Sequence, residues 1–396
     1  MTVVNQILSR LDNINKPQHK FLQVLFATML SVHSHINFLS LGRHSALSER
    51  TFRRQFRGDF DFPAFNRETI AQANCPPLLA FAQDASFIPK SGKHTFGLDK
   101  FWNGSHSRVE KGLELSLIAV LDSRAAAAFA LSAAQTPPHL ARKKGESGKT
   151  RIDFYLEHLR QTAATLPKAV KYGIFDGFYA KQKFVQGVCQ LGFHLICRLR
   201  VDAHLKYLYR GEQKPRGARR KYDGKVQLSD LSRFEAVPTP ERELALFTQI
   251  LWSVALKRRV RVVVIKAKKR TVSLFSTDLE LAATEILRLY RSRFWIEFLF
   301  RDAKQSAGLS DCQARDKKAL EFHWNASFAC VNLARVVALP EKMSNHPAVF
   351  SMKSLKQRFF NERLLQMFIS KLGLEQTTIK YQEHYENLRN YAVIST

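Results

Sequence analysis

The chain has 396 residues, 45% of them hydrophobic, which is long enough for two or three domains and excludes a disordered tail. Its 62 Lys and Arg against 34 Asp and Glu give a formal net charge of +28, so nucleic acid is the leading partner and anionic membrane the weaker alternative. Five cysteines without a CxxC pair argue against disulfides and zinc, and indicate a cytoplasmic setting.

Residues 1–75 are predicted to form a helical DNA-binding domain. Apolar residues recur at helical spacing, for example at Ile7, Leu11 and Leu25. The stretch 21–42 carries no charged residue, but its polar side chains are costly in hydrocarbon. We therefore expect a buried helix pair there and not a membrane span.

Residues 38–56 resemble a helix-turn-helix. Gly42 marks a break, Ser48 is a candidate N-cap, and 49–56 is predicted to be a short helix. In a helix-turn-helix the second helix enters the major groove of DNA. The alternative is a basic, solvated helix in a helical cap. The DNA-binding candidates on this helix are Arg50, Arg53 and Arg54.

From residue 76 the pattern alternates between β and α elements. We predict strands at 78–88, 113–122 and 126–135, a helix at 151–166, a strand at 169–179, a helix at 180–192 and a strand at 193–201. This order describes a mixed sheet with helices against it, and it is also the order of a ribonuclease H-like core. The predicted fold class is α/β, with helical N- and C-terminal regions.

The remaining boundaries divide the core in two. Residues 76–203 form its first part, 204–280 a β-rich insertion, 281–335 the second part with a catalytic helix, and 336–396 the C-terminal helices. Within the insertion, the loop 209–225 is rich in Arg, Lys and Gly, and 258–277 predicts two strands.

One long helix is expected at 281–306. At about 100° per residue, Tyr290, Arg293, Glu297 and Lys304 fall within one stripe about 60° wide. One interpretation is an intrahelical salt-bridge ladder, since Arg293 and Glu297 are an i,i+4 pair. The other is an active-site wall, with Glu297 on a metal ion and the cations on phosphates.

Two further acids favour the second interpretation. Asp84 comes at the end of the first predicted strand and Asp176 at the end of the fourth. These two strands are neighbours in a ribonuclease H-like sheet, although each acid alone could be only a turn or a strand end. Together they place carboxylates side by side, where a hard divalent ion such as Mg²⁺ would compensate the repulsion.

The residues Tyr290, Arg293, Glu297 and Lys304 give Y-x2-R-x3-E-x6-K, which resembles the signature of insertion-sequence transposases of the DDE type, the IS-four family. The segments QDASFIPKSGKHTFGLDKFWNG, IFDGFYAK and FLFRDAKQSAGLSDCQARD are also similar to that family, and the resemblance covers about residues 76–335.

The resemblance implies a transposase that cuts transposon ends and joins them to target DNA by cut-and-paste, with a hairpin intermediate. Asp84, Asp176 and Glu297 would bind two Mg²⁺ ions, for which Mn²⁺ can substitute, and Tyr290, Arg293 and Lys304 would hold end phosphates. It also implies double-stranded DNA as substrate, a homodimer in a synaptic complex, and a bacterial protein associated with the nucleoid.

Other basic residues are candidate phosphate contacts. Those in the predicted helix and loop are Arg301, Arg216, Arg219, Arg220 and Lys221. Two rival functions remain open. One is a ribonuclease H-like nuclease or resolvase that cuts without joining, and the other is a domesticated protein that only occupies DNA ends.

Overall fold

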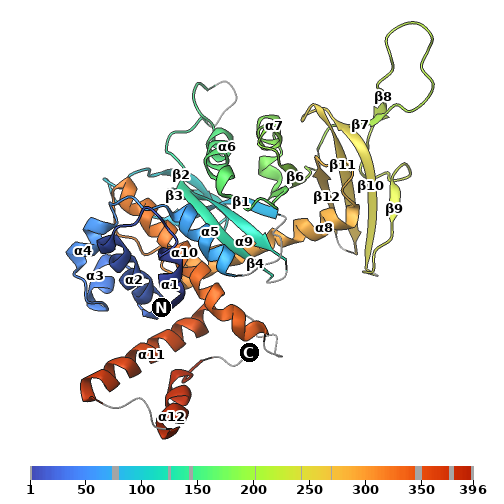
Figure 1. Ribbon diagram of the computed structural model, residues 1–396. Helices are drawn as coiled ribbons and strands as arrows, with labels where there is room; N and C mark the ends of the chain where they lie inside the picture. The colour runs from blue at the N-terminus through green and yellow to red at the C-terminus, as the bar shows by residue number, and fades with distance from the viewer. Residues whose placement is uncertain are drawn as a thin grey trace.

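The computed structural model describes residues 2–73, 80–123, 126–141, 146–200, 202–241, 243–268, 270–343, 350–373 and 379–393. Figure 1 shows a helical N-terminal part, a twisted sheet with helices on both faces, and a helical C-terminal part. In these ranges no helix is both long and apolar enough to cross a membrane.

The N-terminal part is helical, as predicted, with five helices among its described residues. They are α1 (Thr2–Leu8), α2 (Lys16–Ser31), α3 (Phe38–Arg43), α4 (Glu49–Gln55) and α5 (Phe62–Gln72). Side chains cap four of them: the Asn15 side chain accepts a hydrogen bond from Gln18 N, that of Asn37 from Ser40 N, that of Ser48 from Thr51 N, and that of Asp61 from Ala64 N. The expected boundary at residue 75 lies outside the described residues.

The predicted core elements are present in the predicted order. They are β1 (Ala80–Pro89), β3 (Arg108–Asp122), β4 (Ala127–Gln135), α6 (Arg151–Thr162), β5 (Tyr172–Phe175), α7 (Gln182–Gln190) and β6 (His194–Arg198). The ribonuclease H-like order is thus confirmed. The prediction missed β2 (Asp99–Asn103), which pairs with the N-terminal part of β3.

The insertion is β-rich, as predicted, and it extends the core sheet. Its strands are β7 (Leu205–Leu208), β8 (Tyr222–Lys225), β9 (Glu235–Val237), β10 (Leu244–Ser253), β11 (Arg258–Ala267) and β12 (Arg270–Ser276). Because β12 pairs with β6, the described strands form one 12-stranded sheet in the order β2-β3-β1-β5-β6-β12-β11-β10-β7-β8, with β4 on β3 and β9 on β10.

The single helix expected at 281–306 is wrong in one respect. The segment forms two helices, α8 (Ala283–Ser292) and α9 (Phe294–Ser306), separated at Arg293. Around the break the backbone makes tighter bonds three residues apart, from Arg293 N to Tyr290 O and from Ile296 N to Arg293 O. One uniform helical wheel therefore does not describe the whole segment.

The two faces of the sheet bury separate cores. On the face that carries Asp84, apolar residues of β1 and β3 pack with α8, α9, α10 (Lys317–Met343) and the N-terminal helices. On the other face they pack with α6 and α7. The helix α10 spans the boundary expected at 335/336, and the described C-terminal part continues with α11 (Met352–Leu372) and α12 (Ile379–Arg389).

Candidate active site

Asp84 lies in the middle of β1, not at its end as predicted, and Asp176 directly follows the adjacent parallel strand β5. In the pairing of β1 with β5, Ala82 is opposite Ile174. Two residues further along, the same register brings Asp84 opposite Asp176. The strand β5 ends before Asp176, because the carboxylate accepts a hydrogen bond from Phe178 N at 2.9 Å and caps the short 3-10 helix 177–179. The strand expected at 169–179 is therefore shorter than predicted.

Arg293, at the break between α8 and α9, joins two of the predicted acids. Its Nη1 donates to Asp84 Oδ2 at 3.0 Å and its Nη2 donates to Glu297 Oε1 at 2.5 Å. The i,i+4 ion pair of the ladder interpretation is therefore present, but the same guanidinium also reaches β1. The contact brings Glu297 next to Asp84 on β1, the strand beside β5.

The electrostatics of Asp84 reflect this clustering. Its pKa is raised from 3.8 to about 6: burial raises it most, Arg293 acts in the opposite direction, and the charges of Asp176 and Glu297 also raise it. For Arg293, burial opposes the charged form, but Asp84 and Glu297 outweigh it and raise its pKa. The site thus holds more negative charge than one guanidinium neutralises.

Tyr290 and Lys304 flank this cluster from the two helices. Burial raises the pKa of Tyr290, and the charges that act on it include Arg293 and Asp176. Lys304 donates to Ser86 Oγ at 2.8 Å and to Phe87 O at 3.0 Å, and burial lowers its pKa. Arg293 and Lys304 therefore contact β1, whereas Tyr290 lies closer to Asp176 and the end of β6.

The neighbouring charged residues of α9 have other roles. Asp302 is buried in an ion pair with Arg335, at 3.1 Å, and its other oxygen accepts from Arg301 at 3.2 Å. Arg301 is exposed and lies over the Phe298 ring, with its guanidinium carbon 4.5 Å from the centroid. Asp302 is thus a structural acid, distinct from Glu297.

The oxygen ligands of Asp84, Asp176 and Glu297 are the kind that Mg²⁺ prefers. Within the described ranges, however, no group of three or more His, Cys, Asp or Glu side chains is arranged to hold a metal ion. The Arg293 guanidinium lies between two of the three acids. The residue types fit a hard divalent cation, and a metal ion shared by Asp84 and Glu297 would have to take the place of Arg293.

A basic groove of about 1380 Å³ separates α4 from the core. Its charged lining includes the predicted residues Arg50, Arg53 and Arg54, together with Arg57, Lys90, His94, Arg315 and Asp316. Arg53 pairs with Glu49 at 2.6 Å, and Arg57 with Asp316 at 3.4 Å. Sequence reasoning missed Arg57, although it continues the basic face of α4, and missed Arg315, which comes from a distant loop.

The basic residues of the insertion are not near Asp84. Arg216, Arg219, Arg220 and Lys221 lie in the loop between β7 and β8, which extends away from the core at the far end of the sheet (Figure 1). Seven strand spacings of about 4.8 Å separate β8 from β1, roughly 34 Å. Arg220 is engaged locally, with Asp223 at 2.5 Å. Within one chain these residues do not reach Asp84.

A ribonuclease H-like sheet on which Arg293 joins Asp84 to Glu297, with Asp176 on the adjoining segment, is an arrangement that a nuclease can use. A family model described as DDE superfamily endonuclease matches residues 20–259, more than half of the chain, and the chain belongs to that family. It is therefore a transposase-like nuclease that acts on DNA, in a superfamily that normally uses divalent metals. The matched range includes Asp84 and Asp176 and ends before Glu297. No match was found among curated proteins.

Proposed function

We propose that the chain is a transposase of the IS-four type, with Asp84, Asp176 and Glu297 as its catalytic acids. The observation that carries the proposal is the bridge from Arg293 to both Asp84 and Glu297, at 3.0 and 2.5 Å. It brings an acid of the last predicted catalytic helix to Asp84 in β1, more than two hundred residues earlier in the chain. A salt-bridge ladder alone would need no contact with β1.

The three acids would hold two Mg²⁺ ions, for which Mn²⁺ can substitute. Bound there, the ions would stabilise the attacking and leaving oxygens of an in-line displacement at phosphorus. Arg293, released from one acid, would hold a phosphate oxygen in a charge-assisted hydrogen bond. Tyr290 and Lys304, on either side of the acids, would position the same strand.

The proposed reaction is cut-and-paste. Water and then a sugar hydroxyl serve as successive nucleophiles at one site, with no covalent enzyme intermediate, and excision proceeds through a hairpin end. The resemblance of Tyr290, Arg293, Glu297 and Lys304 to the family signature supports this sequence of steps. A nuclease or resolvase would perform only the first of them.

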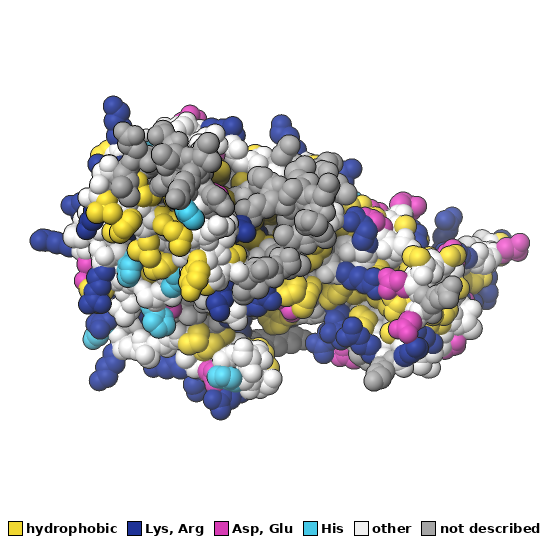
Figure 2. All heavy atoms as spheres, turned by 90° about the horizontal axis from the view of Figure 1, so that it is seen from below, with side chains coloured by type: hydrophobic (Ala, Val, Ile, Leu, Met, Phe, Trp, Pro, Cys, Tyr) yellow, Lys and Arg dark blue, Asp and Glu magenta, His cyan; other side chains and the backbone are white. Residues whose placement is uncertain are grey.

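Double-stranded transposon ends would bind in the groove between α4 and the core. Three arginines of α4, together with Arg57 two residues beyond it, line that groove with Lys90 and Arg315, and phosphates would replace the few acids among them. Figure 2 shows Lys and Arg side chains spread over the lower face of the molecule, with fewer Asp and Glu. The residues Arg216, Arg219, Arg220, Lys221 and Arg301 would contact DNA farther from the cut.

The protein would act as a homodimer that pairs two ends. The side chains of Leu364, Met367, Phe368 and Leu372 are exposed along one face of α11, at 49%, 49%, 60% and 57%. Their spacing is that of a helix-packing stripe. Figure 2 shows hydrophobic side chains gathered on the lower face, where α11 lies at the bottom of Figure 1. A second α11 would cover this stripe.

The test is a cleavage and joining assay with DNA that carries the inverted repeats flanking the gene. We expect Mg²⁺-dependent nicking and, with pre-cut ends, joined products. Glu297→Gln should abolish both while end binding stays near normal, whereas the exposed control Glu280→Gln should be active. Equal loss of binding and cutting would mean that Glu297 is structural. Nicking without joining would indicate a nuclease, and binding without nicking a domesticated end-binding protein.

A further inference from the structure

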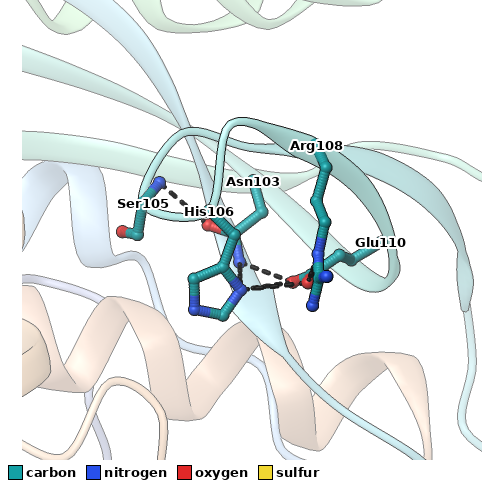
Figure 3. A network of polar contacts seen from close by, with 5 residues as sticks. All are labelled: Asn103, Ser105, His106, Arg108 and Glu110. Atoms are coloured by element: carbon teal, nitrogen blue, oxygen red, sulfur yellow. Dashed lines mark hydrogen bonds and ion pairs between the residues drawn. The ribbon is translucent and has the colours of Figure 1, made fainter.

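The hairpin of β2 and β3 has a tip that is fixed by a polar network (Figure 3). Glu110 accepts hydrogen bonds from Asn103 Nδ2 at 2.7 Å and from Arg108 Nε at 2.5 Å, and lies 2.9 Å from His106 Nδ1. The bond from Asn103, followed by those from His106 and Arg108, lowers the pKa of Glu110 to about 2. Asn103 also accepts from Ser105 N at 3.1 Å, so the turn is held in one conformation.

The opposite face of the same hairpin is exposed. Lys100 is directly across from Lys111, and Trp102 is directly across from Val109. Trp102 is 53% exposed and Val109 is 57% exposed. All four tryptophans lie in the described part of the chain, and Trp102 alone among them is exposed, since Trp252 and Trp295 are half-buried and Trp324 is buried. We call these four residues, Lys100, Trp102, Val109 and Lys111, the hairpin face.

The hairpin face belongs to the same side of the sheet as Asp84. Asp84 is opposite Leu117 in the pairing of β1 with β3. Side chains alternate along a strand, so Lys111 and Val109, six and eight residues before Leu117, point to the side of Asp84. At about 3.4 Å per residue they lie roughly 20 to 27 Å along the strand from the level of Asp84.

The chemistry of the hairpin face selects a polyanion. Lys100 and Lys111 are exposed and lie directly opposite each other, so they can contact phosphates on either side of one nucleotide. Between them and the turn, an exposed indole beside a valine offers a flat apolar surface. Lysines around an exposed aromatic ring form a stacking platform for unpaired bases, whereas a base-paired duplex presents no free base face.

We infer that the hairpin face binds a segment of single-stranded DNA, with Trp102 stacked on a base and Lys100 and Lys111 on the adjoining phosphates. The inference rests on the proposed function, because a strand cut at Asp84, on the same side of the sheet, has a free end that can unpair from its duplex. The network around Glu110 keeps the hairpin rigid, so little ordering would be needed on binding.

The experiment measures binding of the full chain to a short, mixed-sequence single-stranded oligonucleotide and to a blunt duplex, in EDTA so that no cutting occurs. Trp102→Ala should weaken single-strand binding roughly 5- to 100-fold and leave duplex binding unchanged. Trp102→Phe should retain most of the binding, since it keeps an aromatic face. Lys111→Gln should reduce the slope of log K against log salt by roughly 0.7.

Matched controls are Tyr391→Ala, an aromatic side chain 72% exposed at the other end of the chain, and the exposed Lys168→Gln; neither should change binding. Single-strand binding by Trp102→Ala equal to that of the wild type would overturn the inference. So would a changed oligomeric state with intact DNA binding, because the face would then contact a second copy. Because this assay contains no metal ion, it tests single-strand binding without cutting. The proposed function is tested separately, by the cleavage and joining assay.

Discussion

Asp84→Asn should stabilise the metal-free protein while it removes activity. The pKa of Asp84 is raised from 3.8 to about 6, first by burial and then, against Arg293, by Asp176 and Glu297. The folded state therefore binds the proton more tightly than the unfolded state. The stability that this protonation contributes to the folded state is fully present below about pH 4 and is lost as the pH rises through 6.

The magnitude follows from that shift. The difference is 6 − 3.8 = 2.2 pH units, which at about 1.36 kcal/mol per unit is about 3 kcal/mol. At pH 7.5 Asp84→Asn, which imitates the protonated acid, should raise the free energy of unfolding by about that amount. Urea denaturation of both proteins in EDTA measures the difference in their free energies of unfolding. We expect that difference at pH 7.5 and none at pH 4.

The control is Asp302→Asn on α9. Asp302 pairs with Arg335 at 3.1 Å, with only 10% and 7% of the two side chains exposed. The same substitution should therefore destabilise the protein at pH 7.5 by about 1–3 kcal/mol. Magnesium should stabilise the wild type, by about 2.7 kcal/mol at a hundred times its Kd, and should have no such effect on Asp84→Asn. Destabilisation by Asp84→Asn, or equal stabilisation of both proteins by magnesium, would refute the reasoning.

Three further predictions follow from the rest of the molecule. His158 is buried between Ser116 and Ser132, and burial lowers its pKa to about 3. The protein should therefore lose stability as the pH falls below 6.5, by about 2 kcal/mol at pH 5. In urea denaturation the stability of His158→Asn should depend less on pH than that of the wild type, and the same reduced pH dependence in the exposed His139→Asn would contradict this. Phe368→Lys should convert a dimer into a monomer in analytical ultracentrifugation. Arg54→Ala should weaken duplex binding and reduce the salt slope by roughly 0.9, with little effect on single strands.

The sequence by itself determined the order of the core elements and the positions of the acids. Alternation and helical spacing are local properties, and hydrogen bonds between near neighbours fix the ends of elements, as Ser48 does for α4. The sequence also indicated that the strands of Asp84 and Asp176 are neighbours, although Asp84 lies in the middle of β1 and not at its end. Composition alone indicated a polyanionic partner.

Only the tertiary structure decided how distant segments meet. No Gly or Pro marks the break at Arg293, and its side chain acquires two partners only when α9 lies on β1. The groove combines Arg50 with Arg315, and the hairpin face depends on a strand, β2, too short to give a clear pattern. Such contacts depend on the path of the whole chain and on burial, and neither can be predicted from a short stretch of neighbouring residues.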